Sequence, residues 1–207
     1  MSFQEAISLL SHGPSRPTLY KVEMPSRYGF NTSLQDTPSS DNVTMNDYLS
    51  FFCKSISIPE VRLDTVIALG QENMGIAREN PQNVIFGKPL TMTVIENTEF
   101  EVYKMMREWM DKTSVNANQF RGNRSIRMNY YHSYVGDFKI TKLEQPDNQS
   151  DKNEYKEPVA YNFISAYPIR IGQLALSSEE TDTALSFDIA FTYESYYVEG
   201  LDDSLRI

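Results

Sequence analysis

The stretch ALSFDIAFTYESYY, residues 184–197, constrains the fold more than any other part of the chain. Apolar and polar side chains alternate along it almost without interruption, and its apolar side carries Leu185, Phe187, Ile189, Phe191 and Tyr193. A period of two residues is typical of a β-strand with one buried face. About a dozen residues of strand span roughly 40 Å, about twice the usual strand length. We therefore expect a sheet protein whose final strand is unusually long.

The bulk composition excludes several classes of protein. The chain has 207 residues and a formal net charge of -9, which disfavours binding to nucleic-acid phosphates or to an anionic membrane. Hydrophobic residues make up 40%, enough for a core. The lone cysteine, Cys53, cannot form an internal disulfide. With no signal-peptide pattern and no apolar run long enough for a membrane helix, we expect one soluble domain over residues 1–207, made in a cytoplasm.

Patterns along the rest of the chain predict mainly strands. Two helices are expected: a short N-terminal helix over 2–11, and a longer one that Asn97 or Thr98 caps and that runs to about Asp111. The apolar stripe of the second helix is predicted to be Phe100, Tyr103, Met106, Met110 and Trp109. Besides the final strand, strands are expected within 16–24, 48–58, 61–69, 89–97, 131–143 and 159–172.

Three polar stretches, 26–46, 70–88 and 144–157, are expected to lie at the surface. Residues 70–88 are too many and too polar for a simple hairpin, so we expect a long functional loop there. The fold class that follows is mainly β: an antiparallel β-sandwich or barrel with one packed α-helix and a short N-terminal helix.

The sequence predicts no catalytic residue, no cofactor site and no metal site. His12 and His132 are the only histidines, and neither has a second metal-ligand residue at the usual spacing. Cys53 follows Phe51 and Phe52, which predicts a buried thiol. Gly87 and Lys88 lack the remaining residues of a phosphate-binding loop. We expect a binding or structural protein, not an enzyme.

Three arginines, Arg121, Arg124 and Arg127, form the one basic patch that the sequence indicates. On so acidic a chain, contact with carboxylates of a neighbouring copy is the favoured interpretation. A solvated loop and a contact with nucleic acid are the alternatives.

Four stretches, in this order, resemble the tail tube protein of contractile-tailed bacteriophages. SRPTLYKVEM (15–24) resembles the opening strand of that family, and FFCKSISIPEVRLDTV (51–66) resembles its next two strands around a Pro break. GKPLTMTVIENTEFEVYKMMREWMD (87–111) resembles its strand and amphipathic helix. AYPIRIGQLALSSEETDTALSFDIAFTYESYY (166–197) resembles its closing half. The polar stretches 26–46 and 144–157 depart from the family pattern and look like insertions.

The resemblance implies a structural virion protein. Six copies would form a hexameric ring with a shared lumen barrel, and stacked rings would form the inner tail tube inside a contractile sheath. Expected partners are copies of itself, the tail sheath protein, and baseplate and tail-terminator proteins. DNA would pass through the lumen without sequence-specific binding during ejection. The expected location is the tail of the virion, after assembly in the host cytoplasm.

The resemblance also suggests where copies meet. The loop near 70–88 would reach the adjacent ring, and its candidate contact residues are Asn73, Ile76, Arg78 and Asn83. The polar side of the final strand would face the lumen or a neighbouring subunit through Ser186, Asp188, Thr192 and Glu194. If carboxylates line the lumen, their charge would repel DNA phosphates and let DNA slide.

Three other functions fit the sequence less well. One is a tube-initiating, tube-terminating or baseplate subunit with the same fold. Another is the ring protein of a contractile secretion system, or of a headless phage-tail-like particle. The third is a monomeric ligand-binding β-barrel or an unrecognised hydrolase, which would show an enclosed apolar pocket.

Overall fold

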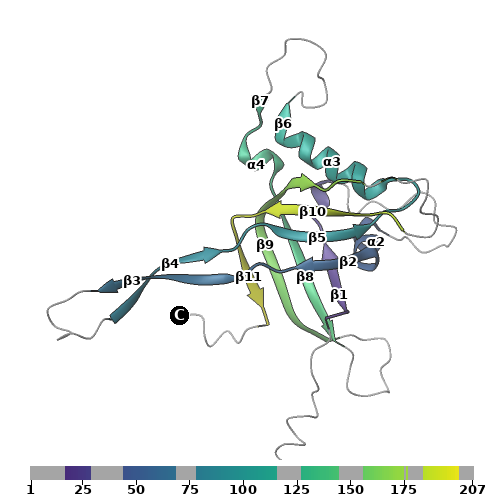
Figure 1. Ribbon diagram of the computed structural model, residues 1–207. Helices are drawn as coiled ribbons and strands as arrows, with labels where there is room; N and C mark the ends of the chain where they lie inside the picture. Colours follow the sequence, from purple (N-terminus) through teal and green to yellow (C-terminus); the bar gives the residue numbers. More distant parts are fainter. Residues whose placement is uncertain are drawn as a thin grey trace, which may run out of the picture. The chain divides into compact units, whose positions relative to one another are not determined.

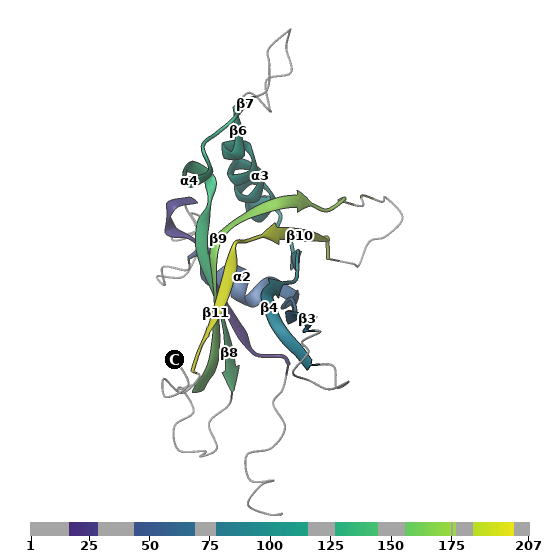
Figure 2. The same cartoon turned by 90° about the vertical axis from the view of Figure 1, so that its left-hand side faces the viewer.

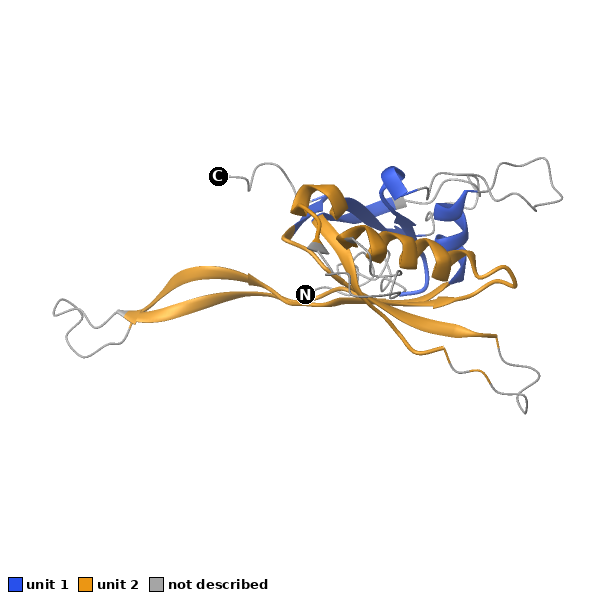
Figure 3. Ribbon diagram, turned by 90° about the horizontal axis from the view of Figure 1, so that it is seen from above, with its two compact units in different colours: residues 1–52, 136–164, 196–207 blue, residues 53–135, 165–195 orange. Residues whose placement is uncertain are grey.

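A computed structural model describes residues 17–28, 44–68, 78–115, 127–144, 156–174, 176 and 184–200. The chain divides into two compact units (Figure 3). Unit 1 comprises residues 1–52, 136–164 and 196–207, and unit 2 comprises residues 53–135 and 165–195. Whether they act as one domain stays a prediction. Within the described ranges, no helix has the length and apolar character needed to cross a bilayer.

Unit 1 contains an antiparallel β-sheet and two short helical segments. Its strands are β1 (Tyr20–Glu23), β8 (Gly136–Glu144), the first part of β9 (Lys156–Ile171) and β11 (Ser195–Glu199). β8 lies between β1 and β9, and β11 pairs with β9. The helical segments are η1 (Ser26–Tyr28) and α2 (Met45–Phe52). The core includes Val22, Leu49, Phe138, Ile140 and Phe163, and the rings of Phe138 and Phe163 stack at 4.9 Å.

Helix α2 corrects a prediction. The apolar run from Tyr48 was expected to belong to a strand, but Tyr48 to Phe52 are helical and the strand begins at Cys53. The local cause is a capping box: the Thr44 N–H donates to Asp47 Oδ2 (3.0 Å), and the Asp47 N–H donates to Thr44 Oγ1 (3.3 Å). This reciprocal pair of hydrogen bonds satisfies backbone N–H groups at the start of α2 and favours a helix in a segment whose residues otherwise prefer strands.

Helix α2 also covers the outer edge of β1. The Val22 N–H donates to Ser50 Oγ (2.9 Å), and the Met24 N–H donates to Asn46 Oδ1 (2.8 Å). Ser50 Oγ also lies 3.2 Å from the Val22 carbonyl oxygen and 2.8 Å from the Asn46 carbonyl oxygen, between which its single proton is shared. Side chains of α2 thus take the place of a further strand beside Val22 and Met24.

Unit 2 contains a second antiparallel arrangement of four strands. In spatial order these are the last part of β9, β10 (Ser186–Thr192), β5 (Leu90–Ile95) and β2 (Cys53–Ser57). Residues directly opposite one another form rows across the strands, and one such row is Ser57, Thr91, Ala190 and Arg170. The core lies on the face with Met92, Ile189 and Phe191, which are fully buried.

Helix α3 (Glu101–Thr113) packs on this apolar face. Trp109 lies 5.9 Å from Phe191, and Tyr103 lies 5.8 Å from Phe187, measured between ring centroids. The helix was predicted, but its apolar stripe only in part: the buried residues are Val102, Met106 and Trp109, whereas Tyr103 and Met110 are half-buried and Val102 was not expected. Phe100 precedes the helix in a left-handed conformation (φ 56°).

The backbone N–H groups at the start of α3 are satisfied by two residues that directly follow β5. The Glu101 N–H donates to Asn97 Oδ1 (3.1 Å), as expected of a cap at Asn97. The Glu96 carboxylate, which sequence reasoning missed, accepts the N–H groups of Val102 (3.3 Å) and Tyr103 (2.9 Å). Thr98 is exposed and makes no such bond.

The other helices and strands of unit 2 lie outside this four-stranded sheet. β3 (Val61–Ala68) and β4 (Arg78–Phe86) form a two-stranded antiparallel ribbon, which we call the arm (Figures 1 and 2). β6 (Ser114–Val115) pairs with β7 (Arg127–Met128), and α4 (Tyr131–Tyr134) follows. Residues 78–86, expected to belong to a loop, are thus a strand, and 131–134, expected to begin a strand, are a helix.

Several predictions are confirmed and others corrected. The mainly β antiparallel fold and the strands near 20–23, 61–68, 90–95 and 156–171 are present. The described strands do not close into a barrel within one chain, because β1 and β2 end the strand order. The long final strand is interrupted between β10 and β11, where Tyr193 is buried and its hydroxyl donates to the Gly87 carbonyl oxygen. The expected helix 2–11 and most of the polar stretches 26–46 and 144–157 lie outside the described residues.

Candidate assembly surface

The face of the unit 2 sheet opposite α3 is lined by small polar side chains. Because side chains alternate along a strand, the residues between the buried ones point to this second face. Ser55 and Ser57 are exposed there, and Thr91, Thr93 and Asp188 are half-buried. Three of the residues predicted for a lumen or subunit contact, Ser186, Asp188 and Thr192, lie along it on β10. The fourth, Glu194, is exposed at the bend between β10 and β11.

This polar face carries charges of both signs. The Thr93 hydroxyl donates to Asp188 Oδ1 at 2.7 Å, across the β5–β10 pair. Arg170 stands exposed in the neighbouring row, opposite Ala190. Asp188 and Arg170 are the charged members of its paired rows among the described residues, and the exposed Lys54 lies beside these rows in β2, at the register shift between Cys53 and Ser55. The acidic surplus of the chain is therefore not concentrated on this face in the described part of the protein.

The four-stranded sheet of unit 2 has two outer strands, and one of them, β2, has no further neighbouring strand among the described residues. β2 is the last strand on one side. On the other side the sheet ends with the last part of β9, Pro168 to Ile171, which pairs with β10. Ile169 and Arg170 are exposed there. Open edges of this kind invite pairing with another chain.

The arm exposes an apolar face. The register places Val61 opposite Phe86 and Leu63 opposite Val84, and a bulge in β4 near Gln82 separates this part from the outer pairs. The apolar face of the arm comprises Val61, Leu63, Ile67, Val84 and Phe86; Leu63 is 62% exposed and Val84 is 55% exposed. An isolated two-stranded ribbon is marginally stable in water, so this face requires a covering surface.

The base of the arm is held to the rest of unit 2. The Gly87 N–H donates to the Glu60 carbonyl oxygen at 2.8 Å, which closes the ribbon beside Val61 and Phe86. The hydroxyl of buried Tyr193 donates to the Gly87 carbonyl oxygen, and Lys88 Nζ lies 5.8 Å from the centre of the Tyr193 ring. A β-carbon at position 87 would lie 3.1 Å from the Glu60 carbonyl oxygen, so glycine suits this close approach.

A second exposed apolar surface surrounds α4. We call it the α4 patch and define it by Met128, Tyr130 and Tyr131, of which Met128 is 78% and Tyr130 is 91% exposed. The patch is firmly seated, because the Trp109 indole N–H donates to the Tyr134 carbonyl oxygen at 2.7 Å and Tyr134 packs edge-on against Tyr167 at 5.0 Å. Sequence reasoning missed this surface, although two adjacent tyrosines at 130–131 were a visible signal.

The other predicted contact residues are only partly described. Arg78 and Asn83 are exposed on β4, opposite Ala68 and Asp64. Arg127 lies in β7 and pairs with Val115. Asn73, Ile76, Arg121 and Arg124 lie outside the described residues.

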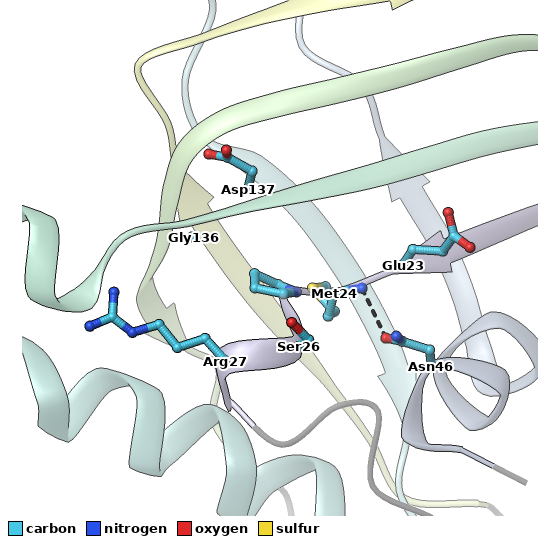
Figure 4. A pocket seen from close by; sticks show the side chains of 8 residues that line it. Glu23, Met24, Ser26, Arg27, Asn46, Gly136 and Asp137 are labelled. Atoms are coloured by element: carbon cyan, nitrogen blue, oxygen red, sulfur yellow. Dashed lines mark hydrogen bonds between the residues drawn. The ribbon is translucent and has the colours of Figure 1, made fainter.

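The described residues hold no group that suggests catalysis or metal binding. No cluster of three or more His, Cys, Asp or Glu side chains occurs among them. Cys53 is buried, as predicted, and its Sγ lies 3.6 Å from the Thr93 carbonyl oxygen. In unit 1 a hollow of about 530 Å³ is lined by Glu23, Arg27, Asn46 and Asp137, among others (Figure 4). The Glu23 carboxylate pairs with Lys21 and the Asn46 amide oxygen accepts the Met24 N–H, so two of these side chains already have partners in the fold.

The chain is similar to a protein in the structure of an extracellular contractile injection system, described as its sheath/tube terminator in the extended state. The identity is 11%, the TM-score is 0.51, and the alignment covers 90% of this chain and 96% of that one. This similarity shows a shared fold.

Two further similarities are lower. The sheath–tube complex of an extracellular contractile injection system gives 12% identity and a TM-score of 0.49, over 96% of this chain and 98% of that one. A crystal structure of an Hcp protein gives 10% identity and a TM-score of 0.44, over 87% and 98%. No curated protein sequence matches the chain. A family model described as phage tail tube protein matches residues 15–199. The chain therefore belongs to the phage tail tube protein family, as its sequence resemblance indicated.

Proposed function

We propose that six copies of this protein close into a ring by joining the β2 edge of one copy to the Pro168–Ile171 edge of the next. Rings of this kind stack into the inner tube of a contractile tail, inside the sheath. The number six comes from the family resemblance. The observation that carries the proposal is the β2 edge, which ends the strand order, together with the exposed side chains of Ile169 and Arg170 on the last part of β9.

The direction of the strands supports closure. Each strand of the unit 2 sheet is antiparallel to its neighbour, so β9 and β5 run one way and β10 and β2 run the other. In a head-to-tail ring, β2 of one copy therefore meets β9 of the next in the antiparallel sense. The alternation continues around the ring, and no strand edge of this sheet is left exposed.

The polar face of the unit 2 sheet would line the lumen. Serine and threonine hydroxyls from β2, β5 and β10 give a hydrated wall, and its charged side chains are the anion Asp188 and the cations Arg170 and Lys54. Such a wall has no array of cations to hold phosphates and no surplus of anions to repel them. DNA would pass without sequence-specific binding, along a near-neutral wall and not the acidic one that the net charge suggested.

The arm would connect neighbouring copies, with its outer residues reaching an adjacent ring. Arg78 and Asn83, together with Asn73 and Ile76, would make these contacts. Arg121, Arg124 and Arg127 would meet carboxylates of a neighbouring copy. The sheath, baseplate and tail-terminator proteins would be its partners in the virion tail, after assembly in the host cytoplasm.

Electron microscopy of the purified full-length protein tests the ring. We expect hollow rings or tubes whose reconstruction places β10 of every copy toward the lumen. Particles that stay monomeric at every concentration would overturn the proposal. Counting copies per virion then separates a tube subunit, present in many rings, from an initiator or terminator, present in one.

A further inference from the structure

Two exposed apolar surfaces of unit 2 lie at the same end of its sheet. The arm continues from β2 beyond Ser57, which stands in the row with Thr91, Ala190 and Arg170. The next pair toward that end joins Thr192 of β10 to Tyr167 of β9. Tyr134 of α4 packs on Tyr167, and the Tyr131 hydroxyl donates to the Ser165 carbonyl oxygen at 3.3 Å. The arm thus projects from the same end of the sheet at which α4 lies.

The arm and the α4 patch stand on opposite edges of that sheet. The arm continues from the β2 edge, and the patch adjoins the β9 edge. Three inter-strand steps of about 4.8 Å separate these edges, roughly 14 Å in all. An arm that leaves along the β2 edge therefore does not cover the patch of its own copy.

We propose that the base of the arm of one copy binds the α4 patch of the next copy in the ring. This inference rests on the β2–β9 junction proposed above. If β2 pairs antiparallel with Pro168–Ile171 of its neighbour, it runs toward Tyr167, and the arm that follows continues beside α4. The apolar face of the arm, with Val61 and Leu63 nearest the base, meets Met128, Tyr130 and Tyr131.

The chemistry of the two surfaces is complementary. Aliphatic side chains from a flat ribbon suit the faces of tyrosine rings, and the Tyr130 hydroxyl can stay at the hydrated rim while the Tyr131 hydroxyl keeps its bond to Ser165. Tyrosine is enriched among residues that contribute most to protein–protein binding. The contact would cover two surfaces that a lone copy leaves in water, and it would add to the backbone hydrogen bonds of the strand junction.

Site-specific photo-cross-linking tests the contact in the assembled protein. A benzophenone amino acid at position 130 of the full chain should cross-link, in rings, to peptides within residues 61–67 or 79–86 of another copy. Dilution to monomers should remove this product. Rings that form but cross-link position 130 only to other segments, or only to sheath protein when sheath is added, would overturn this inference and leave the ring intact. A protein that forms no rings would overturn the ring and this inference together.

A charge-pair experiment gives an independent readout. Leu63→Lys and Tyr130→Glu alone should each raise the protein concentration needed for assembly about tenfold, since each leaves a charge against an apolar surface. The double variant should recover most of the loss, because the two charges then face each other. Leu176→Lys is the matched control, since Leu176 is 79% exposed in unit 2 but lies outside both surfaces. Circular dichroism checks that each variant is folded. Folded single variants that assemble like wild type would overturn the contact.

Discussion

The two units treat the edges of their sheets in opposite ways. In unit 1, Ser50 and Asn46 of α2 occupy the outer hydrogen-bonding groups of Val22 and Met24, so part of the β1 edge is already satisfied within the chain. In unit 2, β2 ends the sheet with no neighbouring strand among the described residues, and the exposed arm follows it. One edge is protected from other chains, and the other is left available to them.

This difference separates folding from assembly. A satisfied edge adds to the stability of a single copy and prevents pairing at the wrong place. An open edge adds nothing to the stability of a single copy. Its hydrogen bonds form only when a second copy binds, so they contribute to the free energy of association. A protein that must form rings, and not irregular aggregates, needs some strand edges to be blocked and leaves open only the edges that join copies in the ring.

The largest effect that we expect comes from proline in β2. Successive N–H groups of a strand point to alternate sides, so one of Ser55 and Ile56 directs its N–H toward β5 and the other directs it outward. Both Ser55→Pro and Ile56→Pro should weaken ring assembly by up to about a hundredfold, because an unmade strand hydrogen bond costs about 1–3 kcal/mol. Sedimentation across a concentration series measures this.

Monomer stability distinguishes the two proline variants. Only the variant whose N–H bonds to β5 should lose unfolding free energy in chemical denaturation at concentrations where no rings form. Ser55→Ala, at an exposed position, should change neither quantity measurably. If the variant with the stable monomer also assembles normally, β2 is not an assembly edge, and the contrast between the units disappears.

A smaller effect is expected from opening the protected edge. Ser50→Ala leaves the part-buried Val22 N–H without its acceptor, so the unfolding free energy should fall by about 1–3 kcal/mol. The exposed β1 edge should also promote irregular aggregates, seen as light scattering that grows with concentration. Ser50→Thr, which keeps a hydroxyl, is the matched control. Loss of stability without any change in aggregation would mean that α2 stabilises unit 1 but does not protect its edge.

The sequence predicted best those elements whose burial has one simple period. Phe187, Ile189 and Phe191 alternate as expected and are buried, and Met106 and Trp109 lie on the buried side of the predicted helix. Periodicity predicts such elements well because each packs one face of its strand or helix against one core, so its apolar residues recur at a constant spacing. The family resemblance then supplied what periodicity does not contain, namely the expectation of a ring with a lumen.

The sequence failed where local or intermolecular factors decide the structure. Tyr48 to Phe52 look like a strand, but the Thr44–Asp47 capping box starts a helix, and that signal was visible in the sequence. β4 escaped prediction because it pairs only with β3, has no core to face and carries a bulge. The α4 patch escaped because exposed tyrosines have no periodic signature. Both missed surfaces are the ones that we assign to contacts between copies.

The smallest expected effect concerns the carboxylates at the starts of α3 and α2. Their contributions to the unfolding free energy should change with pH in opposite directions. Burial raises the pKa of the Glu96 carboxyl above its usual value of about 4.3, although three backbone N–H groups oppose this. A raised pKa in the folded state means that its contribution to stability is complete below the usual pKa and is lost as pH rises through the folded value. The unfolding free energy of wild type minus that of Glu96→Gln should therefore fall as pH rises from about 4.

Helix α2 supplies the contrast. The Thr44 hydroxyl bond, followed by the Thr44 N–H bond, lowers the pKa of Asp47, so its contribution is present above the usual value of about 3.9 and is lost as pH falls through the folded value. Denaturant titrations of wild type, Glu96→Gln and Asp47→Asn, run at low protein concentration from pH 3 to pH 7, measure both trends. If the two differences change with pH in the same direction, the buried start of α3 and the exposed start of α2 do not differ electrostatically as the structure indicates. Opposite slopes would mean that acid weakens the helix protecting β1 while relieving the cost of burying Glu96 behind the assembly sheet.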